Sequence, residues 1–223
     1  MEAKRSIFAR FYFLSNDELL EILSQTKEVE NVRPHLRKVF ENMADLEFKP
    51  DKTIIAMYSG EKEKIQFFET VDPRDKGVEY WMGEIERMMF RSVRAVLFNS
   101  VQDYLKKPRT DWILVHPGQC VLNGSQVHWT TEVEEAIVKE GVQGLSKYFQ
   151  KLDDQLQETV VLVRRKLTKL QSTTLGALIV IDVHAKDVIN NLILAKIDDI
   201  NSFEWISQLR YYWENDNCRV KCI

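Results

Sequence analysis

Histidines and cysteines are the side chains from which a structural zinc site is usually built, and their spacing in this sequence argues against such a site. Neither an HExxH motif nor a pair of CxxC motifs occurs, whereas tetrahedral zinc needs three or four such ligands together. His116 and Cys120 could meet on one helical turn, but Pro117 and Gly118 lie between them. We therefore predict no metal site. The histidines and cysteines are His35, His116, His128, His184, Cys120, Cys218 and Cys222.

Catalytic groups and nucleotide-binding loops are also poorly supported. The tripeptide Asp182-Val183-His184 could place a carboxylate beside a base, but no nucleophile motif such as GxSxG accompanies it. We interpret this tripeptide as a polar stripe on a helix. A P-loop has the form GxxxxGK[ST], and the two candidate glycine pairs are spaced too widely and lack that lysine. We predict no catalytic and no cofactor-binding residue. The glycine pairs are Gly77 with Gly83 and Gly118 with Gly124.

Charged side chains are abundant but balanced, with 31 basic against 34 acidic residues and a net charge of -3. This balance gives no reason to expect binding to nucleic acid or to an anionic membrane. Neighbouring carboxylates are interpreted as solvated helix surface or first-turn charges. Two basic clusters are interpreted as solvated faces, with an acidic protein surface as the alternative ligand. The carboxylates are Glu134 and Glu135, Asp153 and Asp154, and Asp198 and Asp199; the clusters are Arg164, Arg165, Lys166 and Lys169, and Lys106, Lys107 and Arg109.

The composition predicts a mainly helical fold. The 223 residues include only 8 glycines and 5 prolines, which favours long helices over an all-β fold. An apolar content of 44% is sufficient for a buried core. Three cysteines, an odd number, indicate a reducing compartment. The apolar runs are far shorter than the roughly 20 residues that span a bilayer, and Arg10 interrupts the first of them, so we expect neither a membrane span nor a signal peptide.

Hydrophobic periodicity predicts several amphipathic helices. The clearest of these helices extends over residues 78–105 and would rise about 1.5 Å per residue along its axis. Three further long helices should pack side by side, with a weak point at Asn123-Gly124-Ser125 in the first of them. Residues 53–68 form a candidate β-hairpin around the polar connection 59–63. The other predicted helices are 15–25 and a short one after Pro34 that uses Leu36, Val39, Phe40 and Met43; the three long ones are 118–139, 142–170 and 173–194.

The C-terminal residues combine an aromatic helix with a short strand. We predict a helix over residues 202–213, capped by Ser202, and a strand over residues 218–223. A strand there needs neighbours that this chain does not obviously supply, so we expect the chain to be cut from something longer. We expect one elongated unit over residues 1–223, with a soft internal boundary near 106–111. The predicted fold is thus an elongated bundle of long helices with one small β-hairpin insertion.

Several strings, taken together and in order, resemble the dynein heavy chain linker just before its first AAA+ module. The stretch 8–23, FARFYFLSNDELLEIL, is similar to the family's FxRFxFLSxxxLLEIL pattern. A departure is Asn123-Gly124, where we expect a more apolar pair in the family. The remaining similar strings are Pro34-His35-Leu36, Trp112, Pro117-Gly118-Gln119, Trp129-Thr130, Glu134, 174–178, Asp182-Val183-His184 and 205–213.

The resemblance implies a mechanical element that lies across a ring of AAA+ modules and changes shape as the ring hydrolyses ATP. By this resemblance the C-terminal aromatic segment joins the linker to the ring. The implied ring-junction residues are Trp205, Gln208, Arg210, Tyr211, Tyr212 and Trp213. Plain core packing is one interpretation of the aromatic residues, and contact between helices or with an adjoining domain is the other, for which the candidates are Phe11, Phe13, Trp81, Trp112 and Trp129.

The implied partners are the AAA+ ring of the same heavy chain and, through the whole complex, intermediate chains, light chains and microtubules. ATP and Mg belong to the adjoining ring, and no cofactor to this segment. The motifs look axonemal and inner-arm-like, which places the protein in the cytoplasm and cytoskeleton, in the axoneme of a cilium or flagellum. The alternatives are a free-standing helical protein-interaction module and, less favoured, an enzyme acting through carboxylates or His184.

Overall fold

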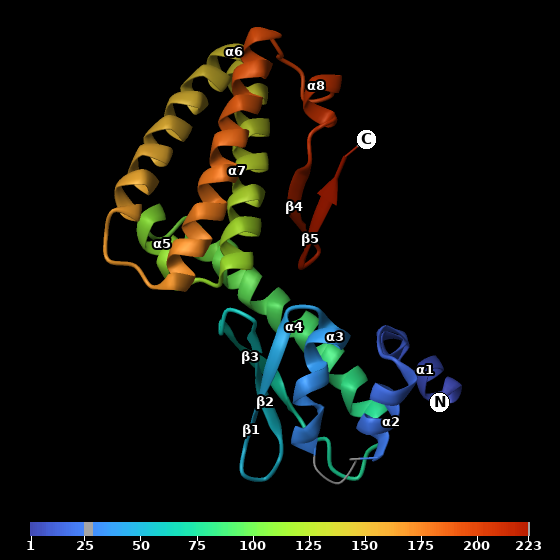
Figure 1. Ribbon diagram of the computed structural model, residues 1–223. Coiled ribbons are helices and arrows are strands. Elements are labelled where there is room, and N and C mark those ends of the chain that lie inside the picture. The colour runs from blue at the N-terminus through green and yellow to red at the C-terminus, as the bar shows by residue number, and fades with distance from the viewer. Residues whose placement is uncertain (25–28, 223) are drawn as a thin grey trace. The chain divides into compact units, whose positions relative to one another are not determined.

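The computed structural model describes residues 1–24 and 29–222 and contains two compact units, Met1–Ala95 and Val96–Ile223. Eight α-helices and two small antiparallel sheets lie within the described residues (Figure 1), so the predicted mainly α class is confirmed. Within the same residues, no helix has both the length and the apolar character needed to cross a membrane. The soft boundary near 106–111 stays a prediction.

In the first unit the short helix α2 starts where the sequence predicts. Its elements up to the sheet are α1 (Glu2–Ile7), η1 (Ala9–Phe13), α2 (Asn16–Ser24), η2 (Val29–His35) and α3 (Leu36–Phe40). The backbone N–H of Glu18 donates to Ser15 Oγ at 3.2 Å, and the N–H of Ser15 donates to a carboxylate oxygen of Glu18 at 2.9 Å. This reciprocal pair is a capping box. Gln25, the predicted helix end, lies outside the described residues.

The predicted hairpin is part of a three-stranded antiparallel sheet of order β1-β2-β3. Its strands are β1 (Met43–Phe48), β2 (Ile54–Ser59) and β3 (Lys64–Val71). The placement of Met43 on the helix after Pro34 was wrong, because Glu41 adopts φ 56° and ends α3. A register shift between Met43 and Asp45 breaks the alternation by which β1 would have been recognised.

Helix α4 (Val78–Tyr104) confirms the helix predicted over 78–105. Its first part belongs to the first unit, where its apolar face packs against the sheet and the short helices. Its remainder, from Val96, belongs to the second unit and carries Leu97 and Val101 into another apolar cluster. The core of the first unit includes Phe11, Leu19, Leu36, Leu46, Ile54, Trp81, Met82 and Ile85.

The second unit is built on three helical segments that lie side by side (Figure 1). Its helices are α5 (Arg109–Val115), α6 (Gly118–Val163), α7 (Lys169–Leu194) and α8 (Phe203–Ile206). Gly141, at φ 55° and ψ -133°, divides α6 into two legs, 118–140 and 142–163. These angles are accessible essentially only to glycine. The predicted break after residue 139 and the side-by-side packing are therefore confirmed.

The connection between α6 and α7 differs from the prediction. The second leg of α6 ends at Val163 instead of near residue 170, and α7 begins at Lys169 instead of near residue 173. The reason is a second capping box. The N–H of Gln171 donates to Thr168 Oγ1 at 3.2 Å, and the N–H of Thr168 donates to Gln171 Oε1 at 3.0 Å.

The predicted aromatic helix over 202–213 was wrong beyond Ile206. Residues Arg210–Glu214 form β4 and Asn217–Lys221 form β5, paired antiparallel. The connecting residues Asn215 and Asp216 have φ 49° and 58°, which suits a two-residue hairpin turn. The C-terminal strand is confirmed for residues 218–221, whereas Cys222 lies beyond the end of β5. Strand β4 supplies the neighbour that we expected to be missing. Ile223 lies outside the described residues.

Gly124, the suspected weak point of α6, is a packing position. A Cβ there would lie 3.0 Å from Cζ2 of the Trp112 ring. Trp112 is fully buried, and its Nε1 donates to the carbonyl of Ser100 at 2.8 Å. A glycine lowers the stability of a helix by about 1 kcal/mol relative to alanine. At Gly124 the missing side chain lets the ring of Trp112 pack directly on the backbone of α6.

The two legs of α6 and helix α7 form a three-helix body. Replacing each of two glycines in this body by alanine should have opposite effects on stability. A Cβ at Gly144 would lie 2.2 Å from the carbonyl oxygen of Ala136, whereas a Cβ at Gly176 meets nothing within 4 Å. We expect Gly144→Ala to lower the free energy of unfolding by about 1–3 kcal/mol and Gly176→Ala to raise it by up to about 1 kcal/mol. Urea unfolding followed by circular dichroism measures both, and equal effects would contradict the close approach at Gly144.

Candidate functional site

Trp205 fixes the root of the C-terminal hairpin in the three-helix body. Its side chain is fully buried, and its ring centroid lies 5.2 Å from that of Trp129 at an interplanar angle of 56°. The indole Nε1 of Trp205 donates to Glu134 Oε1 at 3.3 Å. A buried tryptophan combines a large apolar area with one directional polar contact, so α8 is held in both position and rotation.

Glu134 receives a second donor from β4. The hydroxyl of Tyr212 donates to the same carboxylate oxygen at 2.5 Å, and Arg210 Nη1 donates to the Tyr212 hydroxyl at 3.4 Å. Burial and the bond to Glu134 raise the pKa of Tyr212 to about 12. The interpretation of Glu134 as solvated surface was therefore wrong, because one carboxylate joins the first leg of α6 to both α8 and β4.

The backbone of β4 is also anchored on α6. The N–H of Tyr211 donates to Thr130 Oγ1 at 2.9 Å, and this buried hydroxyl donates in turn to the carbonyl of Gln126 at 2.9 Å. The ring of Trp213 lies 5.7 Å from that of Phe98. Tyr211, Trp213 and Cys218 pack against a small apolar cluster formed by Leu97, Val101, Cys120 and Val127.

The structure thus brings most of the predicted ring-junction residues onto one leg of α6, and their coupling role stays a prediction. Trp205, Tyr211 and Tyr212 contact it directly, and Arg210 reaches it through Tyr212. Gln208 differs, since its Nε2 donates to the carbonyl of Glu204, in the preceding helix α8, at 3.1 Å. Sequence reasoning missed Glu134 and Thr130 as their partners.

The five other aromatic candidates have different surroundings. Phe11 and Trp81 lie in the core of the first unit, while Trp112 and Trp129 lie in two separate cores of the second. These four match the core-packing interpretation. Phe13 is 68% exposed, so it alone among them presents its ring to solvent. A contact of these residues with an adjoining domain stays a prediction.

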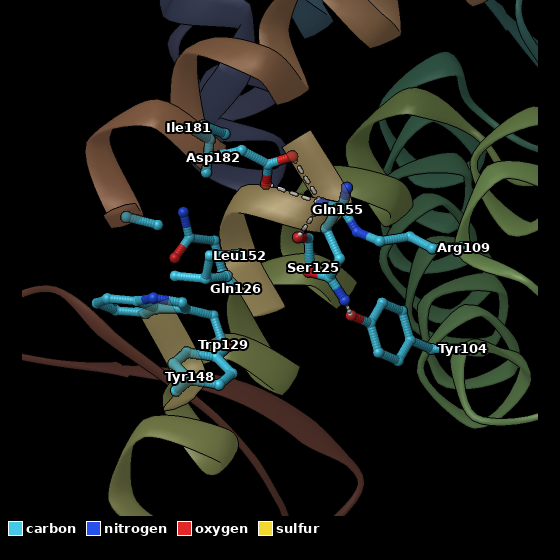
Figure 2. A pocket seen from close by; sticks show the side chains of 11 residues that line it. Tyr104, Arg109, Ser125, Gln126, Trp129, Tyr148, Leu152, Gln155, Ile181 and Asp182 are labelled. Carbon is cyan, nitrogen blue, oxygen red and sulfur yellow. Dashed lines mark hydrogen bonds and ion pairs between the residues drawn. The ribbon is translucent and has the colours of Figure 1, made fainter. Parts of the chain in front are cut away.

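A buried ion pair lies inside the three-helix body (Figure 2). Arg109 Nη2 donates to both carboxylate oxygens of Asp182 at 2.8 Å and to Ser125 Oγ at 3.3 Å, and Nη1 donates to Thr159 Oγ1 at 3.1 Å. These partners come from α7 and from both legs of α6. Burial raises the pKa of Asp182, although the guanidinium of Arg109 opposes this shift. One side chain of α5 therefore binds every long helical segment of the unit.

Two interpretations from the sequence are corrected here. Arg109 was placed on a solvated basic face and Asp182 on a polar stripe, yet their side chains are 8% and 10% exposed. A signal for Asp182 was present in the sequence. It follows Leu178 by four residues and precedes Ala185 by three, so it lies on the buried face of α7 with Leu175 and Ile189.

The ion pair has the surroundings of a structural group. The cavity beside it has a volume of ≈ 10 Å³, against the roughly 300–1,000 Å³ of sites for small-molecule ligands. His184, the base imagined beside Asp182, is exposed, and residues two apart on a helix do not face each other. A groove of ≈ 290 Å³ between the legs of α6 is lined by charged side chains that form the pairs Lys139–Glu135, Lys147–Glu140 and Lys151–Glu132.

Removal of one partner of the ion pair should be costly. We expect Asp182→Ala to lower the free energy of unfolding by about 3–5 kcal/mol, because the guanidinium of Arg109 stays buried without its counter-charge. Asp187→Ala, at an exposed position of the same helix, is the control and should change it by less than about 0.5 kcal/mol. Equal stabilities in urea unfolding would contradict the structural role of the pair.

Glu134 should control the ionisation of Tyr212. The phenol ionises at about 12 in the folded chain and at 10.0 without its surroundings. Its contribution to stability is therefore complete below pH 10 and is lost as the pH rises toward 12. We expect Glu134→Ala to lower the pKa of Tyr212 toward 10.0, measured by ¹³C NMR of the tyrosine ring carbons. Glu135→Ala, at the exposed neighbour paired with Lys139, should leave it unchanged, and an unaltered pKa in Glu134→Ala would contradict the assigned bond.

Comparison with known proteins agrees with the resemblance found in the sequence. A family described as "Dynein heavy chain, N-terminal region 2" matches residues 1–100. Over 100% of its length the chain is 48% identical to dynein axonemal heavy chain 1 and 47% identical to dynein axonemal heavy chain 12, both from Homo sapiens, and 48% identical to dynein axonemal heavy chain 3 from Mus musculus. It spans only 5 to 7% of the length of these relatives. The chain belongs to the dynein heavy chain family and corresponds to a segment of its N-terminal region.

Proposed function

We propose that this chain is a non-catalytic mechanical linker segment of a dynein microtubule motor. It would transmit the ATP-driven conformational change of an AAA+ ring and so produce force in ciliary or flagellar beating. The observation that carries this proposal is the anchoring of the C-terminal hairpin. Trp205, Tyr211 and Tyr212 tie the hairpin to one helical leg through a buried ring, a backbone bond and a side-chain bond.

Displacement of the hairpin would reach the whole second unit by way of α6. Thr130 and Glu134 lie one helical turn apart on the leg that receives the hairpin. The same leg carries Ser125, which Arg109 joins to Asp182 of α7. Closely packed interiors transmit strain instead of absorbing it, so this body is suited to act as a lever.

The proposed setting follows from the relatives. The ring of the same heavy chain would supply ATP and Mg, and this segment would need no cofactor of its own. Intermediate chains, light chains and microtubules would be partners through the whole complex. The names of the relatives place those proteins in axonemes, and we propose the axoneme of a cilium or flagellum, within the cytoskeleton, for this chain. An inner-arm assignment stays a prediction.

A free-standing interaction module is the alternative function. It would fold as a stable monomer and bind a partner through exposed aromatic side chains such as Phe13 and Phe203. The relatives favour the linker, since each matches this chain within a much longer heavy chain. An activity of the segment alone, such as stoichiometric nucleotide binding, would count against the linker.

Loosening the hairpin should uncouple force from ATP hydrolysis. Thr130→Val keeps the volume of the side chain but removes the acceptor of the Tyr211 N–H, which costs about 1–3 kcal/mol for a buried donor. In the complete heavy chain we expect slower microtubule gliding with ATPase activity largely retained. Thr131→Val is the matched control, because Thr131 is exposed and its hydroxyl donates to the carbonyl of Val127 in its own helix.

A second pair of variants tests the same coupling through a larger change. We expect Trp205→Ala to slow gliding more than Thr130→Val does, since it removes the buried ring that fixes α8. Phe203→Ala, at a 68% exposed position of the same helix, should glide as the unchanged motor does. Gliding at the unchanged speed in both Thr130→Val and Trp205→Ala would refute the coupling role.

A further inference from the structure

The hairpin of β4 and β5 has a regular register from which the direction of each backbone group follows. The strands are joined by the two residues Asn215 and Asp216, so Glu214 and Asn217 close the turn as a hydrogen-bonded pair. Antiparallel pairs alternate between bonded and non-bonded. The non-bonded pairs are Tyr211 with Val220 and Trp213 with Cys218, whose N–H and C=O groups point away from the partner strand.

The outer edge of β4 agrees with this assignment. The N–H of Tyr211, which should point outward, donates to Thr130 Oγ1 of α6. At Tyr211 this edge of the hairpin is therefore bonded to the three-helix body. The outer edge of β5 carries the corresponding groups of Cys218 and Val220, and no backbone or side-chain acceptor for their N–H groups occurs among the described residues.

The edge of β5 lacks the irregularity that protects the other sheet. Both pairings of the sheet β1-β2-β3 contain register shifts, whereas the five residue pairs of β4 and β5 are in continuous register. Bulges are one way in which proteins make an edge unsuitable for further pairing. A regular, open edge is a template for another strand, and a two-stranded hairpin gains stability from a third strand.

We propose that the outer edge of β5 binds a third β-strand, which the same heavy chain supplies from outside these 223 residues. This inference rests on the proposed function, because it names the structure through which the rest of the motor would hold the linker. The length of the relatives favours this occupant, since the chain spans only 5 to 7% of them. The strand would pair with the backbone of Cys218 and Val220.

The two faces of β5 specify the chemistry of that strand. Val220 is 51% exposed and lies on the same face as Tyr211, Trp213 and Cys218, which pairing places together. Arg219 and Lys221 lie on the opposite face, with side chains 56% and 49% exposed, and share one carboxylate, that of Glu214 in β4. The partner strand would therefore alternate apolar residues, facing Val220, with acidic residues, facing the two cations.

Amide hydrogen exchange resolved at Cys218 and Val220 tests the proposal directly. We expect both amides to exchange at least about tenfold more slowly in the complete heavy chain than in the 223-residue chain, because strand addition gives their N–H groups acceptors. Equal exchange in the two proteins would overturn the proposal. Slow exchange in the 223-residue chain together with a dimeric mass in solution would also overturn it, in favour of pairing between two copies.

A proline variant separates strand addition from the stability of the hairpin itself. The N–H of Val220 makes no bond within the hairpin, so Val220→Pro should leave the thermal midpoint of the 223-residue chain nearly unchanged. In the heavy chain it should abolish the slow exchange of Cys218, while Val220→Thr, which keeps the N–H, should preserve it. Slow exchange of Cys218 in Val220→Pro would overturn the proposal.

These readouts do not depend on motility. Slow exchange together with normal gliding in the Trp205→Ala and Thr130→Val variants would support the third strand and refute the coupling role. Fast exchange together with slowed gliding in those variants would do the reverse, so the failure of one proposal is distinguishable from the failure of the other.

Discussion

The guanidinium of Arg109 is the group on which the arrangement of the second unit depends. A buried charge is tolerated only with a counter-charge and with hydrogen bonds of good geometry, and Arg109 obtains them from Asp182, Ser125 and Thr159 together. Those residues can converge only if α7 and both legs of α6 keep one register relative to α5. Apolar contacts tolerate small sliding, whereas a multiply bonded ion pair restricts the helices to a single alignment.

The rotation of the first leg of α6 follows from this alignment. With Ser125 turned toward Arg109 and Gly124 against Trp112, the helical period places Thr130 and Glu134 on the side that receives β4. The position of the hairpin is thus decided by contacts more than one helical turn away. A change in the ion pair would therefore displace the acceptors of Tyr211 and Tyr212 without touching either residue.

Local patterns in the sequence predicted the helical part of the fold well. They did not reveal which distant residues meet in the folded chain. Residues 78–105 show a sustained apolar period, and the sheet strands 54–59 and 64–71 flank a polar turn, so both were predictable. Residues 210–213 failed because a run of aromatic residues is compatible with helix and strand alike, and only the turn at Asn215 and Asp216 decides between them. Glu134 and Arg109 resemble surface charges in sequence, since Tyr212 bonds to Glu134 and Asp182 pairs with Arg109 from more than seventy residues away.

On the proposed function, the hairpin and the body differ in the stiffness that they need. No described residue of β4 or β5 is fully buried, whereas Trp205, at the root of the hairpin, and the faces of α6 and α7 are. Regions with few buried contacts open at lower free energy than the core, so the strands are the compliant part and α8 the firm part. A compliant hairpin can change its contacts as the ring moves. Because its root is fixed by Trp205 and its middle by Thr130, that movement is passed to α6 and not dissipated at the joint.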